Sequence, residues 1–250
     1  MDLHLTGRRV LVSGGSRGIR RAIVEHFLAE GAHVAFCARS QTGVAAASAA
    51  FGANATGAMV DVTNPVQVQE WVTSSAAQMG GLDIVVPNVS ALVGGEDLAT
   101  WQRAFNTDLL GTIAMVQAAL PALRASSAAA IVLISSVSGR EIDLFAEPYG
   151  VLKAALTHYG KTLSTRLARD GIRVNTVAPG NVYFTDGVWG DIERNDPAAF
   201  AQSLAANPMG RMGTPEEVAR AVVFLASSAA SFTTGTCLLV DGGLTRGVQF

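Results

Sequence analysis

The chain has 250 residues, of which 49% are hydrophobic and 15% are charged, and its formal net charge is −2. This composition excludes a disordered chain and provides enough apolar side chains for a sizeable core. The sequence has no basic stripe, so nucleic-acid binding has no support. It has no run of about 18 apolar residues that could span a bilayer, and its short polar N-terminus is unlike a secretory signal. We therefore expect a cytoplasmic protein with no nucleic-acid or membrane partner.

Short apolar runs alternate with helical patterns along the whole chain. The apolar runs predict strands over 8–14, 32–37, 56–62, 82–88, 128–135, 171–177 and 235–241. The segments between them predict helices over 21–31, in an alanine-rich stretch ending near 51, and over 65–81, 100–125 and 149–170. The helix over 100–125 is expected to break late, at Pro121, because proline lacks the N–H that a helix needs.

The predicted strands are continuously apolar and do not alternate between apolar and polar residues, which is typical of strands covered on both faces. With helices between them, they predict an α/β fold. We expect a single doubly wound Rossmann-type domain over residues 1–250, with a seven-stranded parallel sheet flanked by helices. The stretch from Pro179 to about Asn207 shows no regular pattern, and we expect a lid or binding loop there.

A glycine-rich turn follows the first predicted strand and precedes the first predicted helix. Glycines in this position let the backbone approach a pyrophosphate, and the start of the helix offers N–H donors to it. The turn therefore predicts dinucleotide binding. The expected contacts are Gly14, Ser16, Arg17, Gly18 and Ile19 in the turn, and Asp61 and Val62 after the third strand, at the adenine edge.

The end of the second predicted strand indicates which dinucleotide binds. An acidic residue there would accept a hydrogen bond from a ribose 2′-hydroxyl, but the sequence reads Ala38-Arg39-Ser40. Arg39 and Ser40, with Arg17 from the glycine turn, suit a 2′-phosphate, because guanidinium groups bind phosphate in a bidentate manner. We therefore predict NADP(H), with NAD(H) as the less favoured cofactor. The alternative is that Arg39 is only a solvated surface side chain.

Three side chains in residues 136–153 carry the candidate chemistry. Ser136 follows an apolar run, and Tyr149 and Lys153 are four positions apart. If Tyr149 opens a helix, this spacing places the phenol and the ammonium on one face. The cation favours the phenolate and lowers the phenol pKa from its usual value of about 10. A tuned phenol beside a hydroxyl can protonate or deprotonate a carbonyl or alcohol oxygen.

Taken together, the motifs resemble those of the short-chain dehydrogenase/reductase family, closest in style to its 3-oxoacyl-acyl-carrier-protein-reductase-like members. They are S-G-G-S-R-G-I at 13–19, D-V at 61–62, L-D-I-V-V at 82–86, I-S-S-V-S-G at 134–139, Y-G-V-L-K at 149–153, R-V-N-T-V-A-P-G at 173–180 and L-V-D-G-G at 239–243. The resemblance implies hydride transfer between a nicotinamide and a carbonyl or secondary alcohol. It also implies a homotetramer, or a homodimer, with the helices over 100–125 and 149–170 at an interface.

The resemblance also implies a role for individual residues. Tyr149 is expected to be the acid/base, Lys153 to bind the nicotinamide ribose, and Ser136 to position the substrate oxygen. Asn88 occupies the family's position after the fourth strand. The residues implied along the nicotinamide are Pro179, Gly180 and Val182.

Three positions depart from the family pattern. Arg20 replaces a glycine of the turn, Ser90 replaces a glycine near the expected cofactor ribose, and Asp108 replaces the catalytic asparagine that holds a proton-relaying water. Asp108 either anchors the water or pairs with Lys153, or its side chain is turned away. A carboxylate near Lys153 would offset the pull of the ammonium on Tyr149 and raise the phenol pKa. We therefore expect an alkaline optimum for alcohol oxidation, and a downward shift in Asp108→Asn.

These observations predict an NADP(H)-dependent oxidoreductase acting on a small apolar or cyclic carbonyl or secondary alcohol. The alternative is non-redox acid/base chemistry, such as elimination, isomerisation or cyclisation, with the same three side chains. A binding protein is disfavoured because it has no need of the Ser–Tyr–Lys set. The four histidines are scattered, so no metal site is expected. Side chains that could face the substrate are Glu141, Asp143, Phe145, Glu147, Tyr183, Phe184 and Trp189.

Overall fold

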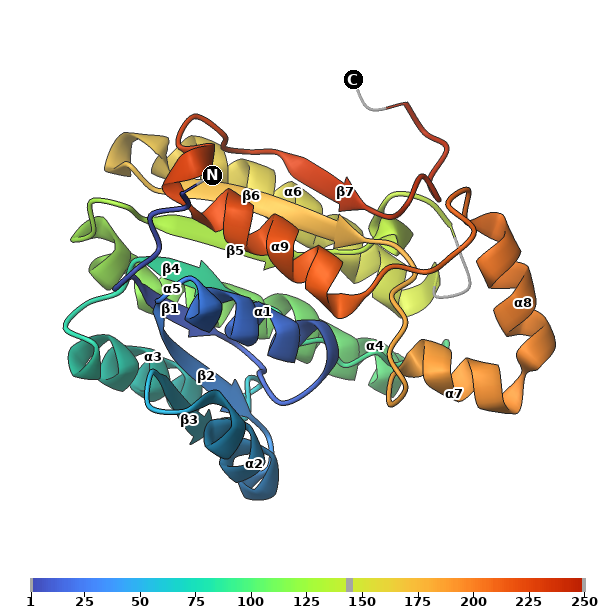
Figure 1. Ribbon diagram of the computed structural model, residues 1–250, viewed down its shortest axis with the longest axis horizontal. Coiled ribbons are helices and arrows are strands. Elements are labelled where there is room, and N and C mark those ends of the chain that lie inside the picture. Colours follow the sequence, from blue (N-terminus) through green and yellow to red (C-terminus); the bar gives the residue numbers. More distant parts are fainter. Residues whose placement is uncertain (1, 143–145, 249–250) are drawn as a thin grey trace.

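The computed structural model describes residues 2–142 and 146–248 of the chain. Its centre is a sheet of seven parallel strands in the order β3-β2-β1-β4-β5-β6-β7 (Figure 1). The strands are β1 (Arg9–Val12), β2 (His33–Ala38), β3 (Ala55–Met59), β4 (Ile84–Val86), β5 (Ala130–Ile134), β6 (Arg173–Pro179) and β7 (Cys237–Val240). This order confirms the doubly wound α/β fold predicted from the alternation of strands and helices.

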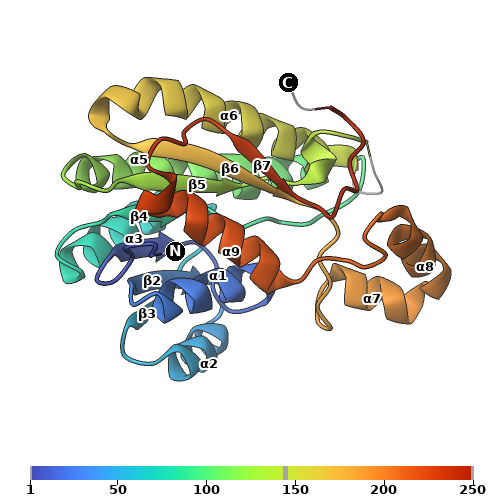
Figure 2. The same cartoon turned by 45° about the horizontal axis from the view of Figure 1, so that its top comes forward.

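Helices cover both faces of the sheet (Figure 2). One face packs against α1 (Gly18–Ala29), α2 (Gln41–Phe51) and α9 (Pro215–Ala226). The other packs against α3 (Pro65–Gln78), α5 (Gly111–Arg124) and α6 (Val151–Leu167). Short helical turns are η2 (Val137–Gly139), η4 (Ala168–Asp170) and η5 (Ser228–Ala230). No helix within the described residues is both long and apolar enough to cross a bilayer.

The two hydrophobic clusters divide the residues of each strand between them. In β1, Val10 and Val12 belong to the cluster under α1 and α9, whereas Leu11 belongs to the cluster under α3 and α5. All three are fully buried. Successive side chains of a strand point to opposite faces, so a strand with helices on both sides needs apolar residues at every position. This explains why the strands read as continuous apolar runs.

The helix predicted over 100–125 is continuous, and the break expected at Pro121 is wrong. α4 (Leu98–Ala104) leads into a π-helical turn, η1 (Phe105–Leu110), and then into α5, which contains Pro121 and ends at Arg124. Proline removes one backbone hydrogen bond. Because Pro121 lies near the C-terminal end of α5, only the last turn is affected and the helix is not divided.

The stretch from Pro179 to Asn207 is more regular than its sequence suggested. It contains α7 (Val188–Asn195) and α8 (Pro197–Ala206), which lie together beyond the carboxyl end of β6 (Figure 1). The Asp196 carboxylate accepts a hydrogen bond from the Ala199 N–H at 3.0 Å, and Pro197 occupies the first turn of α8. Asp followed by Pro is a helix start signal, which indicates α8 in retrospect.

The carboxyl ends of the strands meet at one edge of the sheet. The chain reverses its direction of winding between β1 and β4, which are neighbours in the sheet. In open α/β sheets, ligands bind in the crevice that forms at this switch point. The glycine turn after β1, Asn88 after β4 and Ser136 after β5 all lie at this edge.

At the opposite edge, Asp83 ties β1 to β4. Its side chain is 2% exposed and accepts hydrogen bonds from the Arg9 N–H at 3.0 Å, from Arg9 Nε and Nη2 at 2.8 Å each, and from Ser126 Oγ at 2.6 Å. Burial raises the pKa of Asp83, but the hydrogen bonds from Arg9 and Ser126 outweigh it and lower the pKa to about 2. The ionised carboxylate therefore stabilises the fold.

We expect Asp83→Asn to lower the free energy of unfolding by about 2 kcal/mol near neutral pH. Asp83 contributes stability above its unfolded-state pKa of about 3.9, and the contribution is lost as the pH falls toward about 2. The difference between wild type and variant should therefore narrow below about pH 4. Urea unfolding of both proteins over a pH series measures this difference in the free energy of unfolding.

Asp170→Asn is the matched control, because Asp170 pairs with Arg124 at 2.9 Å on the surface. Exposed pairs of this kind contribute about 0–1 kcal/mol. A destabilisation of Asp83→Asn that stays constant down to about pH 3 would contradict this account of the carboxylate.

Candidate active site

A cavity of about 360 Å³ opens at the carboxyl ends of β4, β5 and β6, between the glycine turn and α7. It is lined by much of the set predicted from the sequence. The predicted residues in its wall are Arg17, Ile19, Asn88, Ser90, Ser136, Tyr149, Lys153, Pro179, Gly180 and Val182. Segments far apart in the chain thus meet around one space.

The other predicted residues lie around this cavity and not in its wall. Arg39 and Ser40 are exposed, and Ser40 Oγ caps α2 by accepting from the Gly43 N–H at 3.1 Å. Asp61 is exposed and its carboxylate accepts from Thr63. The remaining members of this group are Gly14, Ser16, Gly18, Val62 and Asp108.

Tyr149 lies just before α6, two residues after Glu147, whose backbone is extended (φ −134°, ψ 141°). The turn η3 (Ala146–Gly150) leads directly into α6, so Tyr149 lies one turn before Lys153, as the spacing predicted. The Lys153 Nζ atom is 5.4 Å from the centroid of the Tyr149 ring. Single π-helical turns within helices are frequent at functional sites. Here η1, between α4 and α5, is such a turn and contains Asp108.

Lys153 is a buried cation with two partners. Its side chain is 4% exposed, and its Nζ donates to the Ile134 carbonyl at 3.1 Å and lies 3.7 Å from Asp108 Oδ2. Burial lowers the pKa of the ammonium, and the Asp108 carboxylate opposes this shift. An unpaired buried ammonium would be strongly unfavourable. The two oxygens therefore fix the position of the charge beside Tyr149.

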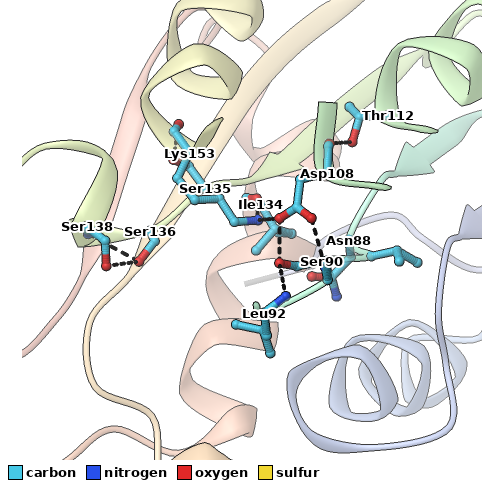
Figure 3. Close-up of polar contacts among 12 residues, drawn as sticks. Asn88, Ser90, Leu92, Asp108, Thr112, Ile134, Ser135, Ser136, Ser138 and Lys153 are labelled. Carbon is cyan, nitrogen blue, oxygen red and sulfur yellow. Dashed lines mark hydrogen bonds and ion pairs between the residues drawn. The ribbon is translucent and has the colours of Figure 1, made fainter. Parts of the chain in front are cut away.

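Asp108 pairs with Lys153 and is itself held by the segment after β4 (Figure 3). Ser90 Oγ donates to Asp108 Oδ2 at 2.5 Å, and the Ala91 N–H donates to Oδ1 at 2.7 Å. The Asp108 side chain is 2% exposed. The Asp108 side chain is therefore not turned away from the site, and it pairs with Lys153. The sequence singled out Ser90 and Asp108 separately, and it did not reveal that they bond to each other.

Ser136 lies on the other side of Lys153 from Ser90 (Figure 3). Its Oγ donates to Ser138 Oγ at 3.1 Å and accepts from the Ser138 N–H at 3.2 Å. The neighbouring Ser135 Oγ donates to the Lys153 carbonyl at 2.7 Å. This bond ties the end of β5 to α6, so the Ser136 hydroxyl and the Tyr149 phenol are held on elements that are joined to each other.

Side chains cover the glycine turn closely. Gly14 has a φ of +75°, and a Cβ there would lie 2.6 Å from Cδ of Arg20. Gly18 has a φ of +55°, and a Cβ there would lie 2.5 Å from the Phe184 ring. Glycine is required at both positions for conformation and for space. Below the turn, the Gly14 N–H donates to Sγ of the buried Cys37 at 3.4 Å.

One unpartnered hydrogen-bond donor in the cavity wall suits a bound dinucleotide. Within residues 2–142 and 146–248, the single buried side-chain polar atom without a hydrogen-bond partner is Nδ2 of Asn88, which lines the cavity. A buried donor without an acceptor is unfavourable by about 1–3 kcal/mol. A ribose hydroxyl or an amide carbonyl would supply the acceptor. The glycine turn and the start of α1 provide the adjoining anion site.

Several lining residues were not identified from the sequence. Leu92, Asn181, Asp186 and Asp191 face the cavity. Asp186 lies just before α7 and Asp191 lies in its first turn, and the helical pattern of α7 was not recognised from the sequence. A second cavity of about 380 Å³ adjoins the first, and Trp189 contributes to both.

Glu141 lines this second cavity, and its Oε1 accepts from the Arg246 and Gly247 N–H groups at 2.9 Å each. It therefore holds the C-terminal segment against the wall of the cavity. The Glu147 residue is exposed. Asp143 and Phe145 lie outside the described residues. Among those that are described, no group of three or more metal-ligating side chains occurs.

We expect Ser90→Ala to lower the free energy of unfolding by about 1–3 kcal/mol, because it removes a donor from a buried carboxylate. In an Asp108→Asn background the acceptor is a neutral amide, so the same change should have less than about half this effect. Urea unfolding of the four proteins measures the coupling.

Ser74→Ala serves as the control, because Ser74 Oγ bonds the Trp71 carbonyl on α3, away from Asp108. It should have the same effect in both backgrounds. Equal effects of Ser90→Ala in the two backgrounds would show that Ser90 and Asp108 are not coupled.

Comparison with known proteins agrees with this geometry. A family profile described as "Enoyl-(Acyl carrier protein) reductase" matches residues 14–245. The chain is 37% identical over 255 residues to an isoepoxydon dehydrogenase of Penicillium expansum, covering 98% of each chain. It is 36% identical over 249 residues to a 3-oxoacyl-[acyl-carrier-protein] reductase of Salmonella typhimurium, covering 97% of this chain and 99% of the relative.

The structural comparison points the same way. Ligand-free aldohexose dehydrogenase of Thermoplasma acidophilum superposes with a TM-score of 0.87 at 32% identity, covering 100% of this chain and 99% of that one. The match extends over the sheet, the glycine turn and the α6 helix, because it spans the whole length of both chains. The chain therefore belongs to the short-chain dehydrogenase/reductase family of nicotinamide-dependent oxidoreductases.

Proposed function

We propose that residues 1–250 form one catalytic domain that transfers hydride between NADP(H) and the carbonyl or secondary alcohol of a small substrate, with Tyr149 as the acid/base. The observation that supports it best is the convergence of Tyr149, Lys153 and Ser136 on one cavity, beside the unpartnered amide of Asn88. When bound, the nicotinamide supplies or accepts the hydride. The protein's own share is positioning and proton transfer.

The three side chains divide the proton chemistry between them. In the reducing direction, the Tyr149 hydroxyl donates its proton to the substrate oxygen as negative charge develops there. The Ser136 hydroxyl binds the same oxygen and orients the carbonyl. The Lys153 ammonium stabilises the phenolate that remains, because opposite charge favours the ionised form. In the oxidising direction, the phenolate takes the proton from the alcohol.

The cofactor preference rests on the side chains near the end of β2. Arg39 and Ser40 follow the strand, Arg17 lies in the glycine turn, and no carboxylate occupies the end of β2. The exposure of Arg39 and Arg17 leaves their guanidinium groups available to a phosphate. Two guanidinium groups bind a 2′-phosphate far better than a 2′-hydroxyl, which favours NADP(H) over NAD(H).

A small, uncharged cyclic substrate suits the cavities best. The two connected spaces of about 360 and 380 Å³ are walled by apolar side chains such as Leu92 and Trp189, and the nearby carboxylates of Asp186 and Asp191 disfavour anions. The names of two relatives, an isoepoxydon dehydrogenase and an aldohexose dehydrogenase, describe enzymes of small molecules. We propose a cyclic ketone or its alcohol as the substrate class.

A second candidate function is non-redox acid/base chemistry with the same three side chains. One observation favours it: the Phe184 ring and the Arg20 stem lie against Gly18 and Gly14, on the face where a dinucleotide would bind. In this alternative these two side chains fill part of the cofactor crevice permanently, and the protein binds neither NADP(H) nor NAD(H).

We also propose a homotetramer, or a homodimer, formed through the α4 to α6 side of the molecule. Four large apolar side chains are exposed there: Leu98 (86%), Phe105 (38%), Leu110 (43%) and Val151 (48%). Exposed apolar residues gathered on neighbouring helices indicate an interaction surface. Sedimentation equilibrium measures the assembly, and Phe105→Lys with Leu110→Lys should dissociate it. A monomeric wild-type protein would contradict the proposal.

The proposed reaction is tested by NADPH and NADH oxidation against cyclic ketones, cyclic diketones and acyl thioesters. We expect turnover of cyclic ketones with NADPH, and a loss of at least about 100-fold in Tyr149→Phe, because general acid catalysis contributes about 10²–10⁴-fold. Retained binding of NADPH in this variant, measured by tryptophan fluorescence, separates the chemical step from folding. Binding of neither dinucleotide would favour the non-redox alternative.

Arg39→Ala tests the cofactor preference in the same assay. It should raise KM for NADPH by about tenfold or more, since loss of a charged hydrogen bond corresponds to about 1.5–3 kcal/mol, and leave KM for NADH nearly unchanged. Arg8→Ala is the matched surface control, because Arg8 lies just before β1, at the edge of the sheet opposite the cavity. Its Nε donates to the His4 carbonyl. Use of NADH with no use of NADPH would overturn the preference.

A further inference from the structure

Arg20 is a cation in the cavity to which the proposed reaction gives no role. It is the third residue of α1, and its stem crosses Gly14 toward the cavity. It lines the same space as Ser90, Tyr149 and Lys153. Burial lowers the pKa of its guanidinium, Arg17 lowers it further, and the carboxylate of Asp108 opposes both. Such a group carries its charge at all accessible pH values.

Asp108 changes the electrostatics that Tyr149 experiences. Its carboxylate lies 3.7 Å from the Lys153 ammonium and is held in place by Ser90 and the Ala91 N–H. An ammonium and a carboxylate at this separation form a pair of zero net charge. The carboxylate opposes the field of the ammonium, so the pair attracts a phenolate less strongly than an ammonium alone would. Lys153 therefore stabilises a phenolate less here than an unpaired ammonium would.

We propose that Arg20 is a positioning residue for proton transfer: its guanidinium supplies the positive charge that Asp108 neutralises at Lys153, so that Tyr149 faces two cations and one carboxylate. The inference rests on the proposed function of Tyr149. The alkaline optimum expected from Asp108 alone is then offset by Arg20, and the two departures from the family pattern compensate each other.

The other charged groups near the phenol leave this balance intact. Arg17 and Arg39 are exposed on the cofactor side, and Asp186 and Asp191 lie in the α7 segment across the cavity. On η3 itself, Glu147 is exposed. Exposed charges are screened by solvent and salt, whereas buried ones are screened much less. Asp108 and Lys153 are buried and Arg20 is half-buried, so these three charges are screened less than the exposed ones.

The chain allows a direct test without cofactor or substrate. It contains three tyrosines, and phenolate formation is visible in the ultraviolet absorbance. Burial raises the pKa of Tyr159, and the hydrogen bond to Glu193 raises that of Tyr183. Both should therefore ionise late. The first phenol to ionise is then assigned by its absence in Tyr149→Phe, with stopped-flow pH jumps to avoid alkaline unfolding.

We expect Arg20→Gln to raise the pKa of Tyr149 by about one unit, and Asp108→Asn to lower it by about one unit, as expected for one buried charge nearby. The double variant should return to within about half a unit of the wild type, because the charges added and removed cancel. Arg20→Lys, which keeps the charge, should also stay within about half a unit. Circular dichroism confirms that each variant is folded.

Arg21→Gln is the matched control, because Arg21 adjoins Arg20 on α1 but pairs with Glu25 on the surface at 2.8 Å. It should leave the titration unchanged. An unchanged Tyr149 titration in Arg20→Gln, with weaker NADPH binding, would overturn the proposal and make Arg20 a phosphate ligand. A full shift in Arg20→Lys would overturn it as well. Since no turnover is measured, failure of the substrate panel does not affect this outcome.

Discussion

The site is built around the need to keep one buried ammonium charged. Lys153 lies inside the protein, where a cation without partners is strongly unfavourable. Its Nζ atom is held by the Ile134 carbonyl at the end of β5 and by Asp108 on η1. β5, α6 and the α4–α5 helix therefore have to meet at one point. Tyr149, one turn before Lys153, is carried to the same point by the start of α6.

The three departures from the family pattern form one connected arrangement. Ser90 supplies a hydroxyl that bonds Asp108, Asp108 pairs with Lys153, and Arg20 reaches the same cavity from α1. Ser90, in place of the family's glycine, donates a hydrogen bond to the Asp108 carboxylate. The neutral asparagine that the family has at position 108 would depend less on such a donor. Considered singly, each change looks like a defect in the site. Considered together, they replace a neutral asparagine in the proton relay with the charged Asp108, which has Ser90 and Lys153 as its partners.

Much of this could be predicted from the sequence, because the relevant signals are local. Continuous apolar runs predicted the seven strands, and the glycine turn with Gly14 and Gly18 was expected between the first strand and the first helix, where the structure has it. The spacing of Tyr149 and Lys153 placed them on one face. The prediction that the helix breaks at Pro121 was wrong, because a proline in the last turn of a helix disturbs fewer backbone hydrogen bonds than one in the middle. The helices α7 and α8 were missed because both are short and the start signal of α8, Asp196 followed by Pro197, was not used. The Ser90–Asp108 bond joins segments whose contact only the fold creates.

The hydrogen bonds that Glu141 accepts from the Arg246 and Gly247 N–H groups bear on how members of this family diverge in substrate. Leu244 and Thr245, near the C-terminus, form part of the wall of the second cavity, and residues of α7 and α8 form another part. Neither part contributes Ser136, Tyr149 or Lys153. Substitutions at Leu244 and Thr245 can therefore reshape the second cavity without disturbing the proton chemistry. Two descendants of one ancestor can share the same reaction and accept different molecules.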